Sequence, residues 1–139
     1  MQPLHQSIQL QEAIALDKKR FINEEIYPQI NQSFTCCVCQ NKVNMQIQPF
    51  KTGSPLDTLY KGNKVLDTGT LIQHKIITKA NHHSKHWGEF LHNDLPTLYF
   101  LAHCTNCKAG TYIGFFSYGE KQPGLDILSI AGVWKYTIV

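Results

Sequence analysis

The sequence predicts an α+β fold, in which an N-terminal helix precedes an antiparallel sheet of about five strands. Two patterns support this prediction. Apolar side chains near the start of the chain recur at spacings of mostly three, four and seven, as in an amphipathic helix. Later apolar segments are short, and several alternate with polar side chains, as in strands. With 139 residues, of which 42% are hydrophobic, we expect a single domain with its own core.

The helix is expected over residues 6–26, within a helical N-terminal segment spanning residues 1–30. Ser7 is a suitable N-cap, and Pro28 would end the helix because proline lacks an amide hydrogen. The proposed apolar face consists of Leu10, Ala13, Ile14, Phe21, Ile22 and Ile26. The polar and charged residues between them would face solvent.

Five later segments are expected to form strands: residues 42–48, 70–78, 97–103, 111–118 and 134–139. The segments 97–103 and 111–118 are apolar on both faces, which is typical of central strands. Residues 86–93 are expected to form a short helix, and Pro123-Gly124 to form a turn.

The net charge of +3 is local rather than general. Residues 40–89 contain seven lysines against three acidic residues, a balance of +4. We interpret residues 51–96 as a lysine- and histidine-rich insert that is either solvated or a docking surface for an acidic partner. Arg20 is the single arginine, which argues against sequence-specific nucleic-acid readout, because such readout depends on the bidentate guanidinium.

Four of the five cysteines form two Cys-x-x-Cys units, at residues 36–39 and 104–107. The chain has no apolar run of about 18 residues, and its first residues lack a basic start followed by an apolar stretch. We therefore expect a cytoplasmic protein without membrane association. In a reducing compartment its cysteines are expected to be thiols or metal ligands rather than disulfides.

Each cysteine pair adjoins an expected strand, so the order is strand, knuckle, strand. In Phe34-Thr35-Cys36-x-x-Cys39 and His103-Cys104-x-x-Cys107 the sequence resembles zinc-ribbon domains, with residues 34–50 and 97–118 as the two halves. The resemblance implies one structural zinc ion held by Cys36, Cys39, Cys104 and Cys107. The 64 residues between the knuckles exceed the familiar gap of roughly 15–20. This long insert is acceptable because loop-closure entropy grows only logarithmically.

Other interpretations of the cysteines remain open. The pairs could be buried thiols, or one pair could be a thioredoxin-like redox site, although neither is followed by a convincing helix. Cys37 is interpreted as a bystander thiol, with replacement of a neighbouring ligand as the alternative. A second, weaker metal site at His82, His83 and His86 is a further alternative to a polar loop.

Three metal-enzyme patterns fit poorly, so the sequence favours a protein that is not an enzyme. A zinc deaminase needs H-x-E and P-C-x-x-C, but His86 and Glu89 are one residue too far apart and no proline precedes Cys104. An HNH-type metal nuclease needs a helix with a histidine after the second cysteine pair, where residues 111–116 read as a strand. A zincin needs H-E-x-x-H, which is absent.

The sequence therefore favours a zinc-ribbon binding protein that recognises a protein partner, as an adaptor, inhibitor or immunity-type protein does. The alternative is nucleic-acid binding through the lysine-rich insert, with aromatic side chains stacking on bases. For either class, the candidate partner-binding residues are Lys61, Lys64, Lys75, Lys79, Lys85 and Trp87.

Overall fold

A computed structural model shows that the chain is mostly β, with helices of at most six residues in its described part. The structure describes residues 6–60, 65–74, 76, 78–84, 88–92, 95–107 and 109–139. Side chains of residues 49, 50, 57, 68, 78–84, 88–92, 95, 96 and 121 are not described. No helix in the described part is long and apolar enough to cross a membrane.

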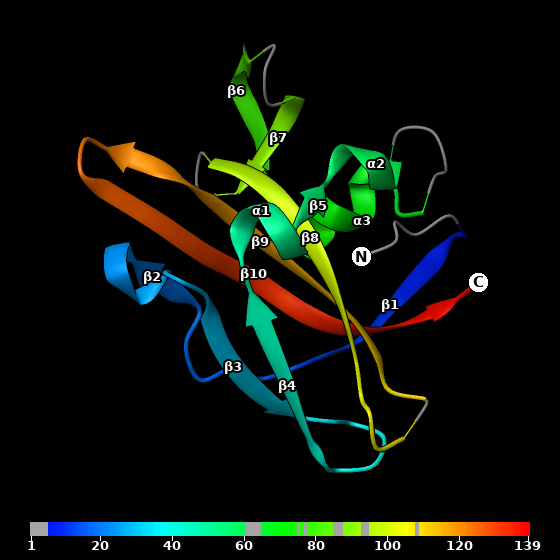
Figure 1. The fold of residues 1–139 in the computed structure, drawn as a ribbon. Coiled ribbons are helices and arrows are strands. Elements are labelled where there is room, and N and C mark those ends of the chain that lie inside the picture. Colours follow the sequence, from blue (N-terminus) through cyan, green and yellow to red (C-terminus); the bar gives the residue numbers. More distant parts are fainter. Residues whose placement is uncertain are drawn as a thin grey trace.

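The described strands pair in antiparallel fashion, and Figure 1 shows their arrangement together with the helices. The strands are β1 (Ile8–Ala13), β2 (Arg20–Ile22), β3 (Ile30–Thr35), β4 (Lys42–Ile47), β5 (Ser54–Pro55), β6 (Thr78–Ser84), β7 (Gly88–His92), β8 (Leu95–His103), β9 (Thr111–Gln122) and β10 (Leu125–Ile138). The helices are the 3₁₀ turn η1 (Asn23–Glu25), α1 (Pro49–Thr52), α2 (Asp57–Tyr60) and α3 (Thr68–Gln73).

The main sheet has the strand order β1-β10-β9-β8-β7-β6, with β2 paired to β10 and β5 paired to β8. The long strands β8, β9 and β10 form its centre, and the β3–β4 hairpin is a separate two-stranded sheet (Figure 1). Pro123-Gly124 forms the turn between β9 and β10, as predicted, and Gly124 has the positive φ of 81° that favours glycine there.

The central sheet is covered on both faces because its strands are apolar on both. On one face, β3 and β4 supply Ile30, Phe34, Val43, Met45 and Ile47 to a core shared with Phe100, Tyr112 and Phe116. On the other face, residues 56–76 supply Leu56, Leu59, Leu71 and Ile76 to a second core with Tyr99, Phe115 and Trp134. Part of the expected solvated insert is therefore a core layer.

The predicted α+β class and the N-terminal helix are wrong. Residues 8–13 form a strand that pairs with the end of β10, and residues 20–22 pair with its beginning. Ile8 and Leu10 pack on the second core, whereas Ile14 and Leu16 pack on the first. A register shift between Leu10 and Ala13 separates these two pairs. Leu10 and Ile14, one from each pair, are four residues apart, which is the spacing that favoured a helix.

Two further local predictions are also wrong. Residues 70–73 of the expected strand 70–78 belong to α3, whose N-cap Asp67 accepts a 2.7 Å hydrogen bond from the Thr70 amide. Within the expected helix 86–93, residues 88–92 form β7, which pairs with β6 and β8. The strands predicted at 42–48, 97–103, 111–118 and 134–139 are confirmed, although β9 and β10 extend well beyond the predicted bounds.

Candidate metal centre

Two β-hairpin loops carry the cysteine pairs and lie side by side at one end of the molecule (Figure 1). The first loop joins β3 to β4, where the Cys36 amide donates to the Asn41 carbonyl oxygen at 2.8 Å and Gln40 adopts a φ of 65°. The second loop joins β8 to β9, where the Cys104 amide donates to the Gly110 carbonyl oxygen at 2.8 Å. Each pair thus occupies a tight turn whose flanking strands fix its position.

The structure brings together the four cysteines that the sequence singled out. Their Sγ atoms all lie within 4.8 Å of one another, and we call this group the four-cysteine cluster: Cys36, Cys39, Cys104 and Cys107. The shortest Sγ–Sγ distances join the two loops, at 3.7 Å for Cys36 to Cys107 and 3.6 Å for Cys39 to Cys104. Tetrahedral zinc with Zn–S bonds of about 2.3 Å places sulfurs about 3.8 Å apart. The donor set therefore fits a metal ion of that size.

The surroundings of the cluster leave room for the sulfurs. A Cβ atom at Gly110 would lie 2.8 Å from the Cys36 Sγ and 2.9 Å from the Cys104 Cβ, so only glycine fits there. Cys36 and Cys104 are buried in the first core, whereas Cys39 and Cys107 are half-buried. The cluster therefore joins the hydrophobic core to the surface.

The buried Tyr112 hydroxyl links the cluster to the bystander cysteine. It donates a hydrogen bond to the Cys36 Sγ at 3.0 Å and accepts one from the Cys37 amide at 3.0 Å. The Cys37 sulfur lies 3.5 Å from the same hydroxyl and outside the four-cysteine cluster. Cys37 therefore contacts Tyr112 through both its amide and its sulfur, and its role as a bystander thiol stays a prediction.

Hydrogen bonds to the sulfurs of the first loop favour ionisation of the Cys36 and Cys39 thiols. For Cys36, burial opposes ionisation, but hydrogen bonds from Tyr112 and from backbone amides outweigh it and lower the pKa of its thiol. Hydrogen bonds from the side chain and backbone of Asn41 lower the pKa of Cys39 to about 6. Burial, together with the neighbouring sulfurs, raises the pKa of Cys107 to about 12. Accumulating thiolate charge at such short distances is relieved by a bound cation.

The other candidate residues cannot be placed in the same way. Five of the candidate partner-binding residues lie outside the described residues: Lys61, Lys64, Lys75, Lys85 and Trp87. Lys79 lies in β6, as do His82 and His83, but their side chains are not described, and His86 lies outside the described residues. In the described part of the chain, no second group of three potential metal ligands occurs.

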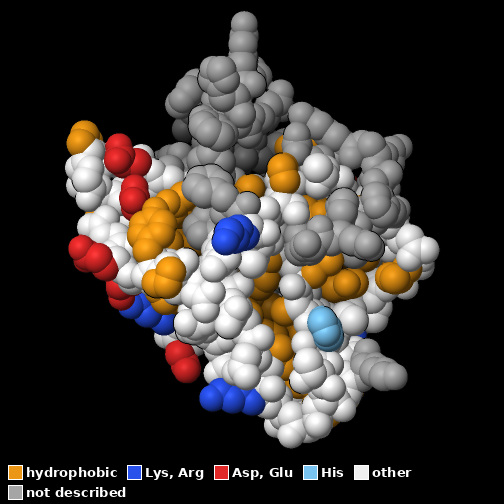
Figure 2. All heavy atoms as spheres, viewed as in Figure 1, with side chains coloured by type: hydrophobic (Ala, Val, Ile, Leu, Met, Phe, Trp, Pro, Cys, Tyr) orange, Lys and Arg blue, Asp and Glu red, His pale blue; other side chains and the backbone are white. Residues whose placement is uncertain are grey.

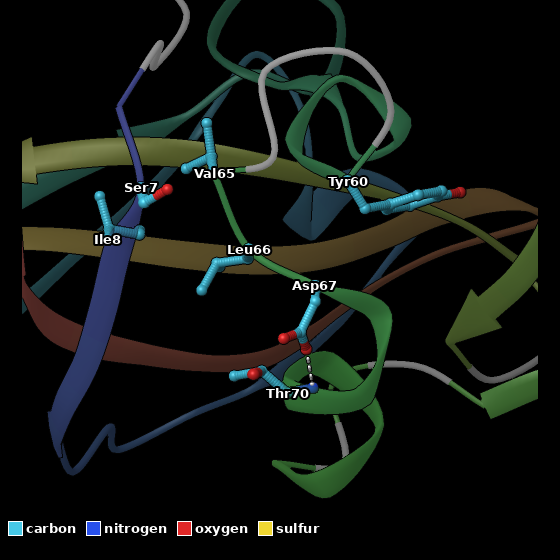
Figure 3. Close-up of a pocket in the computed structure, with 7 residues that line it drawn as sticks. All are labelled: Ser7, Ile8, Tyr60, Val65, Leu66, Asp67 and Thr70. Atoms are coloured by element: carbon cyan, nitrogen blue, oxygen red, sulfur yellow. Dashed lines mark hydrogen bonds between the residues drawn. The ribbon is translucent and has the colours of Figure 1, made fainter. Parts of the chain in front are cut away.

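A hollow between β1 and α3 lies on the face of the sheet that carries the second core. It has a volume of about 460 Å³ and is lined by Ile8, Val65, Leu66 and Asp67 among others (Figure 3). Figure 3 shows the Asp67 carboxylate turned to the Thr70 amide, so this acidic group caps α3. We therefore assign this carboxylate a structural role.

Sequence reasoning missed Tyr112 as part of the site. Its position one residue into an apolar strand gave no sign of a polar role, and its hydroxyl reaches the first knuckle only because the two hairpins pack together. Comparison with known proteins adds nothing to this assignment: no protein-family model matches the chain, nor does any curated protein or solved structure. The site therefore rests on its own geometry.

Removing the Tyr112 hydroxyl tests the link to the cluster. In Tyr112→Phe the Cys37 amide loses its acceptor and Cys36 loses a donor, so we expect the free energy of unfolding to fall by about 1–3 kcal/mol. Loss of an outer hydrogen bond is expected to weaken metal binding about 10–100-fold. Urea unfolding and competition with a chromogenic chelator measure the two effects.

The matched control is Tyr136→Phe, because Tyr136 is a half-buried tyrosine on β10 that packs against the second core. An equal loss of metal affinity in both variants would contradict the role given to Tyr112.

Proposed function

We propose that this protein is a zinc-stabilised binding module of the zinc-ribbon kind that recognises a protein partner and performs no catalysis. The observation that supports the zinc ion is the set of four Sγ atoms within 4.8 Å of one another, supplied by two hairpin loops. Four cysteine ligands are typical of structural zinc, whereas catalytic zinc keeps one position for water or substrate. The ion would connect two hairpins that share a core.

Among the described side chains, basic and acidic residues nearly balance. Six basic and seven acidic side chains are described, so this part of the surface has no net positive charge. The basic side chains are Lys18, Lys19, Arg20, Lys42, Lys51 and Lys135, and the acidic ones are Glu12, Asp17, Glu24, Glu25, Asp67, Glu120 and Asp126. Nucleic-acid binding modules instead carry a basic face that neutralises phosphates. The lysines of residues 61–85 remain the basis of the alternative prediction.

Metal analysis tests the first half of this proposal. Protein purified without chelator is expected to contain one zinc ion per chain, and exhaustive treatment with chelator is expected to release it and destabilise the fold. Preparations that fold without any bound transition metal would overturn the zinc assignment.

The salt dependence of binding tests the second half. Recognition of a protein is expected to retain a fixed stoichiometry at moderate salt, whereas binding to duplex or single-stranded nucleic acid falls steeply with salt. Replacing the five candidate lysines together by serine is expected to leave partner binding largely intact. Tight, strongly salt-dependent binding to a nucleic acid, abolished by that replacement, would favour the alternative.

A further inference from the structure

The outer edge of β4 lies beside a groove and pairs with no other strand in the described part of the chain. β3 and β4 pair without a register shift, and their last pair is Thr35 with Lys42. The hydrogen bond from the Cys36 amide to the Asn41 carbonyl oxygen continues the same register by one residue. In an antiparallel pair, backbone groups point alternately toward and away from the partner. Val43 and Met45 therefore direct their amides and carbonyls to β3, whereas Asn44 and Gln46 direct theirs away from it.

No described strand pairs with this outer edge. The edge faces a groove of about 340 Å³ between β4 and β8. The other wall of the groove is residues 100–103 of β8. β5 pairs with β8 only at Leu98 and Tyr99, so it does not cover this wall. The two-hairpin arrangement thus leaves a strand edge open along one wall of the groove.

The groove floor is apolar because the first core reaches the surface there. Met45 and Phe100 belong to that core, and Ala102 packs against it. Figure 2 shows hydrophobic side chains in a stripe on this face of the molecule, at the position of β4 and β8 in Figure 1. An extended chain laid along β4 would place alternate side chains against this floor.

The polar rim of the groove carries a basic side chain. Lys51 lines it beside the imidazole of His103, and none of the described lining residues is an aspartate or glutamate. Lys42, at the start of the same strand, is also exposed. The acidic side chains visible in Figure 2 lie away from the apolar stripe. The rim therefore complements a segment with acidic side chains on its outward face.

We propose that β4 binds an extended acidic peptide segment of a protein partner by β-strand addition, in the groove between β4 and β8. This deepens the proposed protein-recognition function and rests on it. Backbone hydrogen bonds at Asn44 and Gln46 would supply affinity, and the apolar floor with its basic rim would select a chain that alternates apolar and acidic residues.

A synthetic probe tests the proposal directly on the unmodified protein. The probe is a capped nine-residue peptide that alternates glutamate and valine, and its control carries lysine in place of glutamate. Titration is expected to slow hydrogen exchange at the Asn44 and Gln46 amides about tenfold or more, because exposed edge amides become bonded. The lysine peptide is expected to bind at least about tenfold more weakly. No protection of these two amides at saturating probe would overturn the proposal.

A pair of proline variants tests the edge itself. Asn44→Pro removes an outward amide of β4, and Ser33→Pro removes an outward amide from the opposite edge of the same hairpin. We expect the first to weaken probe binding about tenfold or more, and the second to leave it unchanged. Equal binding by the two variants would contradict the proposal. Zinc content, measured on both, shows whether the hairpin is intact.

Two other outcomes separate this inference from the function on which it rests. If the β4 amides are protected without probe and sedimentation shows a concentration-dependent dimer, the occupant is a second copy of this chain and the peptide proposal fails. If the Asn44→Pro variant keeps its zinc and still binds a protein partner with unchanged affinity, partner recognition stands and uses another surface. If the wild-type protein itself holds no zinc, the proposed zinc-stabilised module fails, and with it the basis of this inference.

Discussion

Replacing Cys36 by serine is expected to abolish stoichiometric zinc binding and to lower the free energy of unfolding by about 3–5 kcal/mol. Cys36 is fully buried, its sulfur lies 3.7 Å from that of Cys107, and its loop is joined to the other hairpin through the cluster. Losing one of four ligands would leave the remaining thiols without the cation that we propose they share. We expect the thermal midpoint to fall by more than about 10 °C, as measured by circular dichroism.

The neighbouring Cys37→Ser is the matched control. Its sulfur lies outside the cluster, and its amide keeps the hydrogen bond to Tyr112 after the substitution. We expect its stability to remain within about 0.5 kcal/mol of wild type, with one zinc ion per chain. Chelator is expected to bring wild type and Cys37→Ser to the midpoint of Cys36→Ser. Identical behaviour of the two serine variants before chelation would show that no metal joins the hairpins.

A methyl group at Gly114 is expected to destabilise the protein by about 2–3 kcal/mol. Gly114 lies opposite Phe100 in the β8–β9 pairing, and an added Cβ would lie 2.2 Å from the Phe100 Cζ. The phenyl ring covers the glycine in the first core, so Gly114→Ala would push it from its place beside Phe116. Urea unfolding measures the loss.

Gly69→Ala provides a control of opposite sign. Gly69 lies in α3, and the added Cβ would meet the Asp67 Oδ1 at 3.4 Å, an ordinary contact distance. Alanine favours the helix, so we expect stability to be unchanged or to rise by up to about 1 kcal/mol. If Gly114→Ala were as stable as Gly69→Ala, the packing of Phe100 on the sheet would be misassigned.

The same ring connects stability with the proposed docking groove, because Phe100 forms part of its floor. Gly114→Ala is therefore also expected to weaken binding of the glutamate–valine probe, whereas Gly69→Ala is not. The groove thus depends on the packing between the two hairpins as well as on the β4 edge.

Local sequence determined the parts of the molecule whose pattern has one physical solution. Val43, Met45 and Ile47 alternate with polar residues, and β4 indeed buries them on one face. Residues 97–103 and 111–118 are apolar on both sides, and each lies in a sheet that is covered on both faces. The two Cys-x-x-Cys units identified four sulfurs that the structure brings together. Two thiols spaced for one tight turn indicate a metal ligand pair by residue type and spacing alone, whatever the rest of the fold.

Tertiary structure decided the remainder, because short segments satisfy more than one periodicity. Residues 8–16 contain two alternating pairs separated by a register shift, and only pairing with β10 makes residues 8–13 a strand instead of part of a helix. Residues 70–78 alternate like a strand, yet Asp67 caps residues 68–73 as a helix that places Leu71 in the second core. Likewise, the Tyr112 hydroxyl reaches Cys36, and β4 faces β8 across a groove, because two hairpins far apart in sequence pack together. Such long-range contacts depend on shape and burial, which no local pattern encodes.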